Sequence, residues 1–193
     1  MSLKRRDLML GALGGGVLAA GGVHAADNWP SKPVRIVVPY PPGGSSDIIA
    51  RSISQQLSEA LGQPVIVENK PGANGNLGAD FVAKSKPDGY TLLLCDVGAL
   101  AISPSVYTRL PFDPSKDLRG VTMLAYSPHL LVVHPSVQAN NLKELVALSK
   151  KSEINFAVTA TGSAPHLAGV ALERATGAKW VYVPYKGLSL IHI

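Results

Sequence analysis

Residues 34–47 combine a strand, a tight loop and the start of a helix in one short segment of this chain. Val34–Val38 is a β-branched apolar run interrupted only by Arg35. Prolines and two glycines break the run at 39–44, and the polar residues 45–47 are typical of a helix N-terminus. Such a junction directs unbonded backbone N–H groups and the positive end of a helix dipole at one point. The segment therefore predicts an α/β fold with an anion-binding loop.

Strands and helices are expected to alternate along most of the chain. In the first helix Ile49, Ile53, Leu57 and Leu61 recur at four-residue spacing, and Gly62 supplies a left-handed stop. Alternation of this kind implies right-handed crossovers and parallel sheets covered on both faces. The expected strands are 34–38, 64–68, 90–94, 154–158 and 180–183, and the expected helices are 47–61, 77–84, 141–151 and 167–176.

Two further apolar runs, 121–125 and 130–134, are expected to be strands on either side of a break at 126–129. We interpret this break as a crossing between two lobes. That interpretation assigns residues 26–127 to the first lobe and 128–187 to the second.

The junction of strand, glycine loop and helix recurs in the second lobe. There, the strand at 154–158 leads into a Gly/Ser/Thr loop at 159–166, which opens the next helix. In the first lobe, the loop at 96–99 follows the strand at 90–94 and reaches the same carboxyl edge as the loop at 41–46. Ligands of parallel sheets bind beyond this edge. Loops of this kind on two lobes predict a cleft that holds a ligand from both sides.

Structural interpretations compete with ligand binding at each of these positions. Glycines such as Gly43, Gly44 and Gly162 often serve only the turn in which they lie. Asp47 suits a helix N-cap, which needs no further role. The ligand-binding interpretation rests on the combination of loops in one α/β chain.

A hydrolase is the catalytic alternative. Ser45 or Ser163 could be combined with His166 and Asp96 into a Ser-His-Asp arrangement. No G-x-S-x-G motif accompanies either serine, and no P-loop motif is present. We therefore expect no enzymatic activity.

The first residues indicate export to the periplasm. Lys4, Arg5 and Arg6 precede an apolar stretch at 8–23, and a small-residue cleavage site ends at Ala25. Residues 1–25 are therefore interpreted as a signal peptide, with the general secretory route and the twin-arginine route both open. No later stretch is long and apolar enough to cross a bilayer.

Composition excludes several classes of site. Without the signal peptide the formal charge falls from +5 to about +3, and the remaining charges are scattered singly without a basic stripe, so we expect no nucleic acid partner. Cys95 is the only cysteine, which rules out an internal disulfide and favours a buried small side chain. His129, His134 and His166 lack metal-ligand spacing, and we expect no metal and no cofactor.

Several blocks of sequence resemble the tripartite tricarboxylate transporter substrate-binding proteins, the Bug receptors. The resemblance runs from Trp29 to Gly187 and follows the order of the family's motifs. The similar blocks are residues 29–35, 38–47, 62–73, 87–92, 166–168 and 183–187.

The resemblance implies an α/β, two-lobed periplasmic-binding-protein architecture of the Venus-flytrap type with parallel-type sheets. It also implies a monomeric receptor that closes like a hinge on a small organic anion, and that works with transporter membrane subunits. In this family the carboxylate is held by loop backbone, hydroxyl groups and ordered water, without a dedicated arginine. The implied ligand contacts are Tyr40, Gly43, Gly44, Ser45, Ser46, Asp47, Asp96, Val97, Gly98, Thr161, Gly162, Ser163 and His166.

The chain departs from the family pattern in two places. The loop 95–98 lacks the Thr/Asn-rich composition that we associate with the family, so the identity of the solute stays open. The end of the chain, 188–193, is interpreted as an aberrant tail, which predicts an architecture incomplete at the C-terminus. A periplasmic sensor lobe that presents a solute to a two-component kinase remains an alternative to transport.

Overall fold

The computed structural model describes residues 28–185. The chain divides into a unit Met1–Ser31 and a unit Lys32–Ile193. In the first unit, the peptide bond between Trp29 and Pro30 is cis. The expected signal peptide and the expected tail at 188–193 lie outside the described residues. Within 28–185, none of the helices has the length and apolar character needed to span a membrane.

A parallel three-stranded sheet forms the first half of the described chain. It contains β1 (Val34–Val38), β2 (Val65–Asn69) and β3 (Thr91–Leu93) in the order β2-β1-β3. The chain thus moves from β1 to one side for β2, and then to the other side for β3. The loops that leave β1 and β3 at their carboxyl ends therefore flank a topological switch point, where open α/β sheets bind their ligands.

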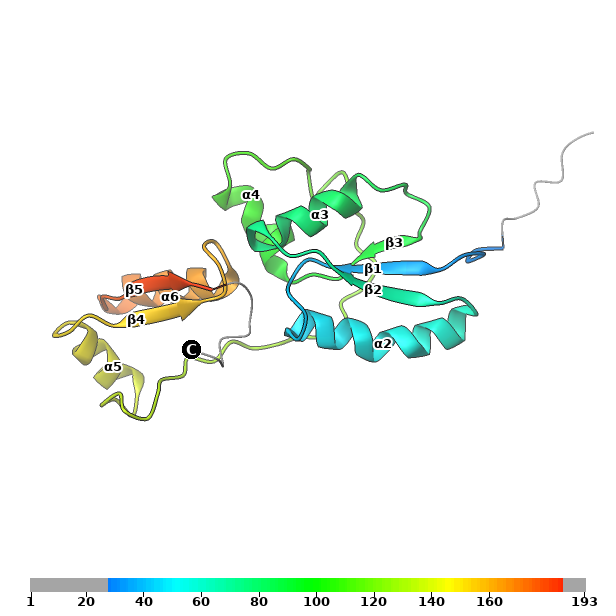
Figure 1. Ribbon diagram of the computed structural model, residues 1–193. Coiled ribbons are helices and arrows are strands. Elements are labelled where there is room, and N and C mark those ends of the chain that lie inside the picture. Colours follow the sequence, from blue (N-terminus) through cyan, green and yellow to red (C-terminus); the bar gives the residue numbers. More distant parts are fainter. Residues whose placement is uncertain (1–27, 186–193) are drawn as a thin grey trace, which may run out of the picture. The chain divides into compact units, whose positions relative to one another are not determined.

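Two helices cover this sheet, with α2 (Ser45–Leu61) on one face and α3 (Asn76–Ala83) on the other (Figure 1). The core under α2 contains Ile36, Val38 and Ala50, all at most 3% exposed. The predicted helix 47–61 is confirmed, although it begins two residues earlier. It ends where expected, because Gly62 adopts the left-handed φ of 64° that favours glycine.

The segment after β3 is helical where the sequence predicted only a loop. A π-helical turn, η2 (Gly98–Ile102), runs directly into α4 (Ser103–Val106). Another short helix, the 3-10 turn η1 (Ala73–Gly75), precedes α3. Both short helices start at the carboxyl edge of the sheet, beside the switch point.

The predicted strands at 121–125 and 130–134 are wrong. Both segments are irregular, and their apolar side chains are exposed, with Val121 at 85% and Leu130 at 83%. A β-branched pattern favours a strand, but a strand forms only where a second strand accepts its backbone hydrogen bonds. Among the described residues, no strand pairs with either segment.

The second half of the described chain is a smaller parallel unit, as predicted. It contains α5 (Leu142–Ser149), β4 (Asn155–Val158), α6 (Ala164–Thr176) and β5 (Val181–Pro184), and β4 pairs with β5. Leu145, Ala178 and Trp180 form its buried core. The division into lobes at residues 127 and 128 stays a prediction.

Candidate functional site

The loops that leave β1 and β3 meet at the switch point. The Tyr40 hydroxyl donates a hydrogen bond to Asp96 Oδ1 over 2.6 Å. Its backbone carbonyl accepts one from Asn69 Nδ2 at the end of β2, over 3.1 Å. Tyr40 thereby joins the loop after β1 to the loop after β3 and to the end of β2. The sequence predicted that the loops after β1 and β3 converge, because strands and helices alternate, but it did not predict the contact with Asn69.

Asp47 holds the first loop in shape. Its carboxylate is 3% exposed and accepts hydrogen bonds from Gly43 N at 2.9 Å and from Asn69 Nδ2 at 2.9 Å. Arg51 Nε adds a third bond at 3.0 Å, and chiefly this contact lowers the pKa of Asp47 to about 2. The Asp47 side chain is thus engaged inside the loop. Any contact between Asp47 and a ligand would have to come from its backbone N–H.

The N-terminus of α2 is uncapped. Gly44 occupies the N-cap position and offers no side chain, and no other side chain caps the helix. The N–H groups of Ser45 and Ser46 donate no hydrogen bond to any described residue. A helix of 17 residues therefore presents free donors at the carboxyl edge of the sheet. This is the feature that suits an anion.

The loop before α3 also belongs to this region, although the sequence analysis gave it no role. Ala73 and Asn74 both have positive φ, at 48° and 55°. Backbone of this kind in non-glycine residues is strained and concentrates at functional sites. Asn74 Nδ2 donates to the Gly162 carbonyl at 3.3 Å. The buried amide of Asn76 has no partner among the described residues. The two asparagines of the run Gly-Ala-Asn-Gly-Asn were the sequence signal that could have indicated this part of the site.

The loop after β3 is built around Asp96. Its Oδ1 accepts a second hydrogen bond from Gly98 N at 2.7 Å. Val97 is 57% exposed, and Thr161 in the later loop is also exposed. Burial raises the pKa of the half-buried Cys95 thiol to about 12, so this thiol is protonated and a weak nucleophile.

The second glycine loop is already capped internally. Gly162 N donates to His166 Nδ1 at 3.0 Å, and His166 N donates to Ser163 Oγ at 3.4 Å. The Ser163 hydroxyl donates to the Ala160 carbonyl at 2.7 Å. Ser163 and His166 thus bond to separate backbone groups rather than as a nucleophile and its base. The two loops therefore differ, because α6 has a side-chain cap and α2 has none.

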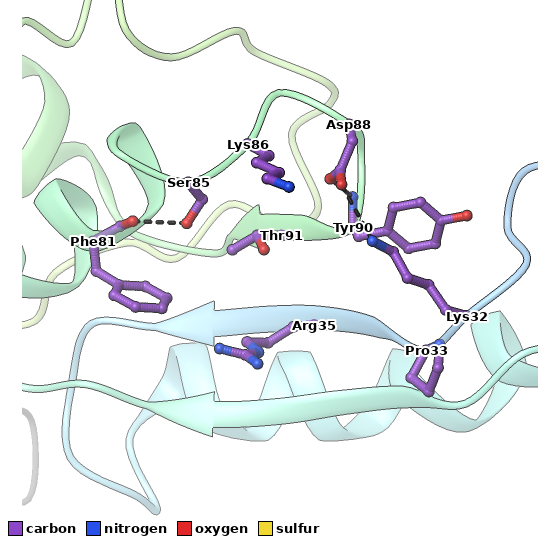
Figure 2. Close-up of a pocket in the computed structure, with 9 residues that line it drawn as sticks. All are labelled: Lys32, Pro33, Arg35, Phe81, Ser85, Lys86, Asp88, Tyr90 and Thr91. Carbon is purple, nitrogen blue, oxygen red and sulfur yellow. Dashed lines mark hydrogen bonds and ion pairs between the residues drawn. The ribbon is translucent and has the colours of Figure 1, made fainter.

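A surface hollow of about 330 Å³ lies near the amino ends of the strands, away from these loops (Figure 2). In it, Lys32 Nζ approaches Asp88 Oδ2 at 3.3 Å and also lies over the Tyr90 ring. Arg35 pairs with Glu68 at 3.2 Å. The Lys32 contacts fasten the segment before β1 to the turn before β3, and the Arg35–Glu68 pair joins β1 to β2. The hollow shares no residue with the predicted site.

The predicted residues therefore fall into two groups. Tyr40, Asp96 and Gly98 share hydrogen bonds at the switch point, with the loop 43–47 beside them. Gly162, Ser163 and His166 form a second cluster at the start of α6. Asn74, in the loop before α3, belongs to neither group and donates a hydrogen bond to Gly162 of the second.

Comparisons with known proteins identify relatives of this chain. Residues 49–190 match the family described as the tripartite tricarboxylate transporter family receptor. Protein BugT of Bordetella pertussis is 41% identical over 176 residues, which are 88% of this chain and 54% of BugT.

Two solved structures share the fold. The R. palustris protein Rpa4515, solved with adipate, is 35% identical with a TM-score of 0.79. MatC from Rhodopseudomonas palustris, solved with bound malate, is 31% identical with a TM-score of 0.75. Each alignment covers 82% of this chain, and 54% and 55% of the respective structures.

The chain thus spans about half the length of the relatives it matches. The family match nevertheless covers well over half of the chain itself, and the parallel α/β sheets are those of its solved relatives. The chain belongs to the tripartite tricarboxylate transporter receptor family.

Proposed function

We propose that this chain forms the ligand-capturing part of a periplasmic receptor for a small carboxylate-bearing solute. The uncapped N-terminus of α2 at the switch point is the observation that carries the proposal, because its free N–H groups suit a carboxylate. Adipate and malate in the solved relatives are both small carboxylates.

The receptor delivers its solute to a tripartite tricarboxylate-type membrane transporter and performs no chemistry on it. Two lobes close on the ligand, and they contain residues 26–127 and 128–187 respectively. Closure stabilises the bound state because the ligand contacts both lobes only when they are closed. The first loop contains no arginine, and Arg51 of α2 is already paired with Asp47, so backbone and hydroxyl donors hold the carboxylate.

A small carboxylate-bearing solute should stabilise the full-length product of the gene. At a concentration about a hundredfold above the dissociation constant, a ligand adds roughly 2.7 kcal/mol to the free energy of unfolding. Thermal denaturation with adipate, malate and a panel of other organic acids measures this. If a folded protein gains no stability from any acid in the panel, the receptor proposal is wrong.

Ser45→Pro should weaken binding of the solute without destabilising the fold. Ser45 is the first residue of α2, where proline is favoured, and Gly44 has the extended ψ of 167° that a following proline requires. The change removes one free N–H donor. Loss of one hydrogen bond to a charged group should lower affinity by about tenfold or more.

Ser45→Ala is the matched control for this experiment, because it removes the hydroxyl and keeps the N–H. Isothermal titration with the best ligand of the panel compares the two variants. Equal affinity of Ser45→Pro and the native chain would show that the α2 N-terminus does not hold the carboxylate.

A further inference from the structure

Asp96 places a negative charge without an ion-pair partner in the proposed site. It is exposed, and among residues 28–185 no lysine, arginine or histidine pairs with it. Its Oδ1 accepts the bonds from Tyr40 and Gly98, whereas its Oδ2 accepts none from the described residues. One oxygen of this carboxylate is therefore free to accept a donor from outside the chain.

The same carboxylate occupies donors that a ligand carboxylate would need. The Tyr40 hydroxyl has one proton, and it uses this proton to donate a hydrogen bond to Asp96 over 2.6 Å. Burial, and then the charge of Asp96, raise the pKa of Tyr40 above its ordinary value, so the hydroxyl keeps this proton. The N–H of Gly98 is committed to Asp96 in the same way. At this end of the site, the Asp96 carboxylate thus accepts the hydrogen bonds that a ligand carboxylate would otherwise accept.

The Asp96 carboxylate lies close to the backbone at Gly98. A Cβ on Gly98 would lie 2.9 Å from Asp96 Oδ1, so glycine allows the carboxylate to approach the backbone. A structural role in starting the helical segment 98–106 needs only the acceptor oxygen. That role does not need the charge, because the amide oxygen of asparagine accepts the same two bonds.

We propose that Asp96 determines the class of solute: the site takes a monocarboxylate whose far end carries an ammonium group, and it disfavours a second carboxylate at that end. The inference rests on the proposed function, with the ligand carboxylate at the N-terminus of α2. The ammonium group donates to the free Oδ2 of Asp96. A second carboxylate there meets a like charge and finds the Tyr40 and Gly98 donors occupied.

Pairs of probes that differ only at one end test this inference. Glutarate and 4-aminobutyrate share three methylene groups, and adipate and 5-aminopentanoate share four. Isothermal titration of the full-length product should show the amino acid of the better-fitting pair binding about tenfold or more tightly than its dicarboxylate, since unit charges a few ångströms apart interact this strongly.

Asp96→Asn should reverse or erase this preference by strengthening dicarboxylate binding and weakening amino-acid binding. Asp88→Asn is the matched control, because Asp88 Oδ1 likewise accepts the N–H two residues on, at Tyr90, but lies in the hollow of Figure 2. The control should leave both affinities unchanged. A purely structural role for Asp96 would not change the ratio of the two affinities.

The outcomes separate the two proposals. If dicarboxylates bind the native chain and Asp96→Asn leaves the affinity ratio unchanged, the inference about Asp96 fails and the receptor function stands. If folded native protein and both variants bind neither class, the receptor function fails and the inference fails with it.

A second measurement uses only the native chain, so it tests the inference even if Asp96→Asn does not fold. Salt screens the charge of Asp96. Raising the sodium chloride concentration should therefore weaken binding of the amino acid by more than it weakens binding of the dicarboxylate. Equal salt dependence of the two ligands would contradict the inference.

Discussion

Trp180→Ala should lower the free energy of unfolding of the smaller parallel unit, α5 to β5, by about 4 kcal/mol, the usual cost of emptying an aromatic core site. The Trp180 side chain is 7% exposed and packs with Leu145 and Ala178. Its ring lies 5.2 Å from that of Phe156, and its Nε1–H donates to the Tyr182 hydroxyl over 3.0 Å. Alanine removes the largest side chain of this small core and leaves the tyrosine without its donor.

The loss should extend to the second glycine loop. The Tyr182 ring lies edge-on to His166 at 4.7 Å, and His166 Nδ1 accepts the Gly162 N–H. The hydroxyl of Tyr182 also donates to Glu173 on α6. Trp180 therefore supports the loop through Tyr182, so Trp180→Ala should loosen the loop as well as the core.

Urea unfolding followed by circular dichroism measures the effect of Trp180→Ala. Trp180→Phe retains most of the buried volume and should cost roughly half as much. Val181→Ala, at the neighbouring residue, which is 46% exposed, should cost less than about 1 kcal/mol. An equal loss in Trp180→Ala and Val181→Ala would contradict the assignment of Trp180 to the core.

The fold could be predicted where the signal is local. The helix α2 follows from the spacing of its isoleucines and leucines and from Gly62, and α5 follows from Asn141, whose side chain accepts the Glu144 N–H as expected of a cap. Parallel pairing followed from alternation of strands and helices, and it is confirmed in both sheets. Each of these inferences needs only a few neighbouring residues.

The errors arise where structure depends on distant residues. The apolar segments 121–125 and 130–134 have strand composition, but a strand also needs a partner, which sequence pattern cannot supply. The π-helical turn Gly98–Ile102 is a rare conformation without a reliable local signature. The positive φ of Ala73 and Asn74 likewise reflects packing around the loop rather than intrinsic preference.

The candidate site, like the fold, could be predicted only in part. The sequence predicted which loops converge, but it treated their glycine N–H groups as free. In the structure, Gly43, Gly98 and Gly162 donate to Asp47, Asp96 and His166 respectively. Side-chain acceptors within the loops thus use several of the expected donors, and the free ones remain at the start of α2.

Asp47→Asn should lower the free energy of unfolding by about 3 kcal/mol near neutral pH. Asp47 is buried, and it joins Gly43, Asn69 and Arg51 through four hydrogen bonds. Asparagine retains one acceptor oxygen but loses the ion pair with Arg51. Arg51 is half exposed, so the cost comes from hydrogen bonds of the buried carboxylate, and bonds to a charged group contribute about 1.5–3 kcal/mol each. The loop at 39–44 should also lose its fixed shape, and ligand affinity should fall with it.

The size of this difference should depend on pH, because the pKa of Asp47 is about 2 in the folded chain, below its ordinary value of 3.8. A carboxyl whose pKa is lowered by folding stabilises the fold above its unfolded pKa, and this contribution is lost as the pH falls toward the folded pKa. The contribution of Asp47, about 2 kcal/mol, is therefore complete at pH 6 and decreases below pH 4. The gap between the native chain and Asp47→Asn should narrow by about 1 kcal/mol between pH 6 and pH 3.

Urea unfolding of both chains at each pH measures this narrowing. The comparison cancels the contribution of Asp113, whose pKa is also about 2, because both chains contain it. Glu59→Gln, on the exposed side of the same helix, serves as the control and should give a small, nearly constant difference from the native chain. A gap for Asp47→Asn that stayed constant between pH 6 and pH 3 would mean that the charge of Asp47 does not stabilise the loop. The loop would then depend on the shape of the side chain alone.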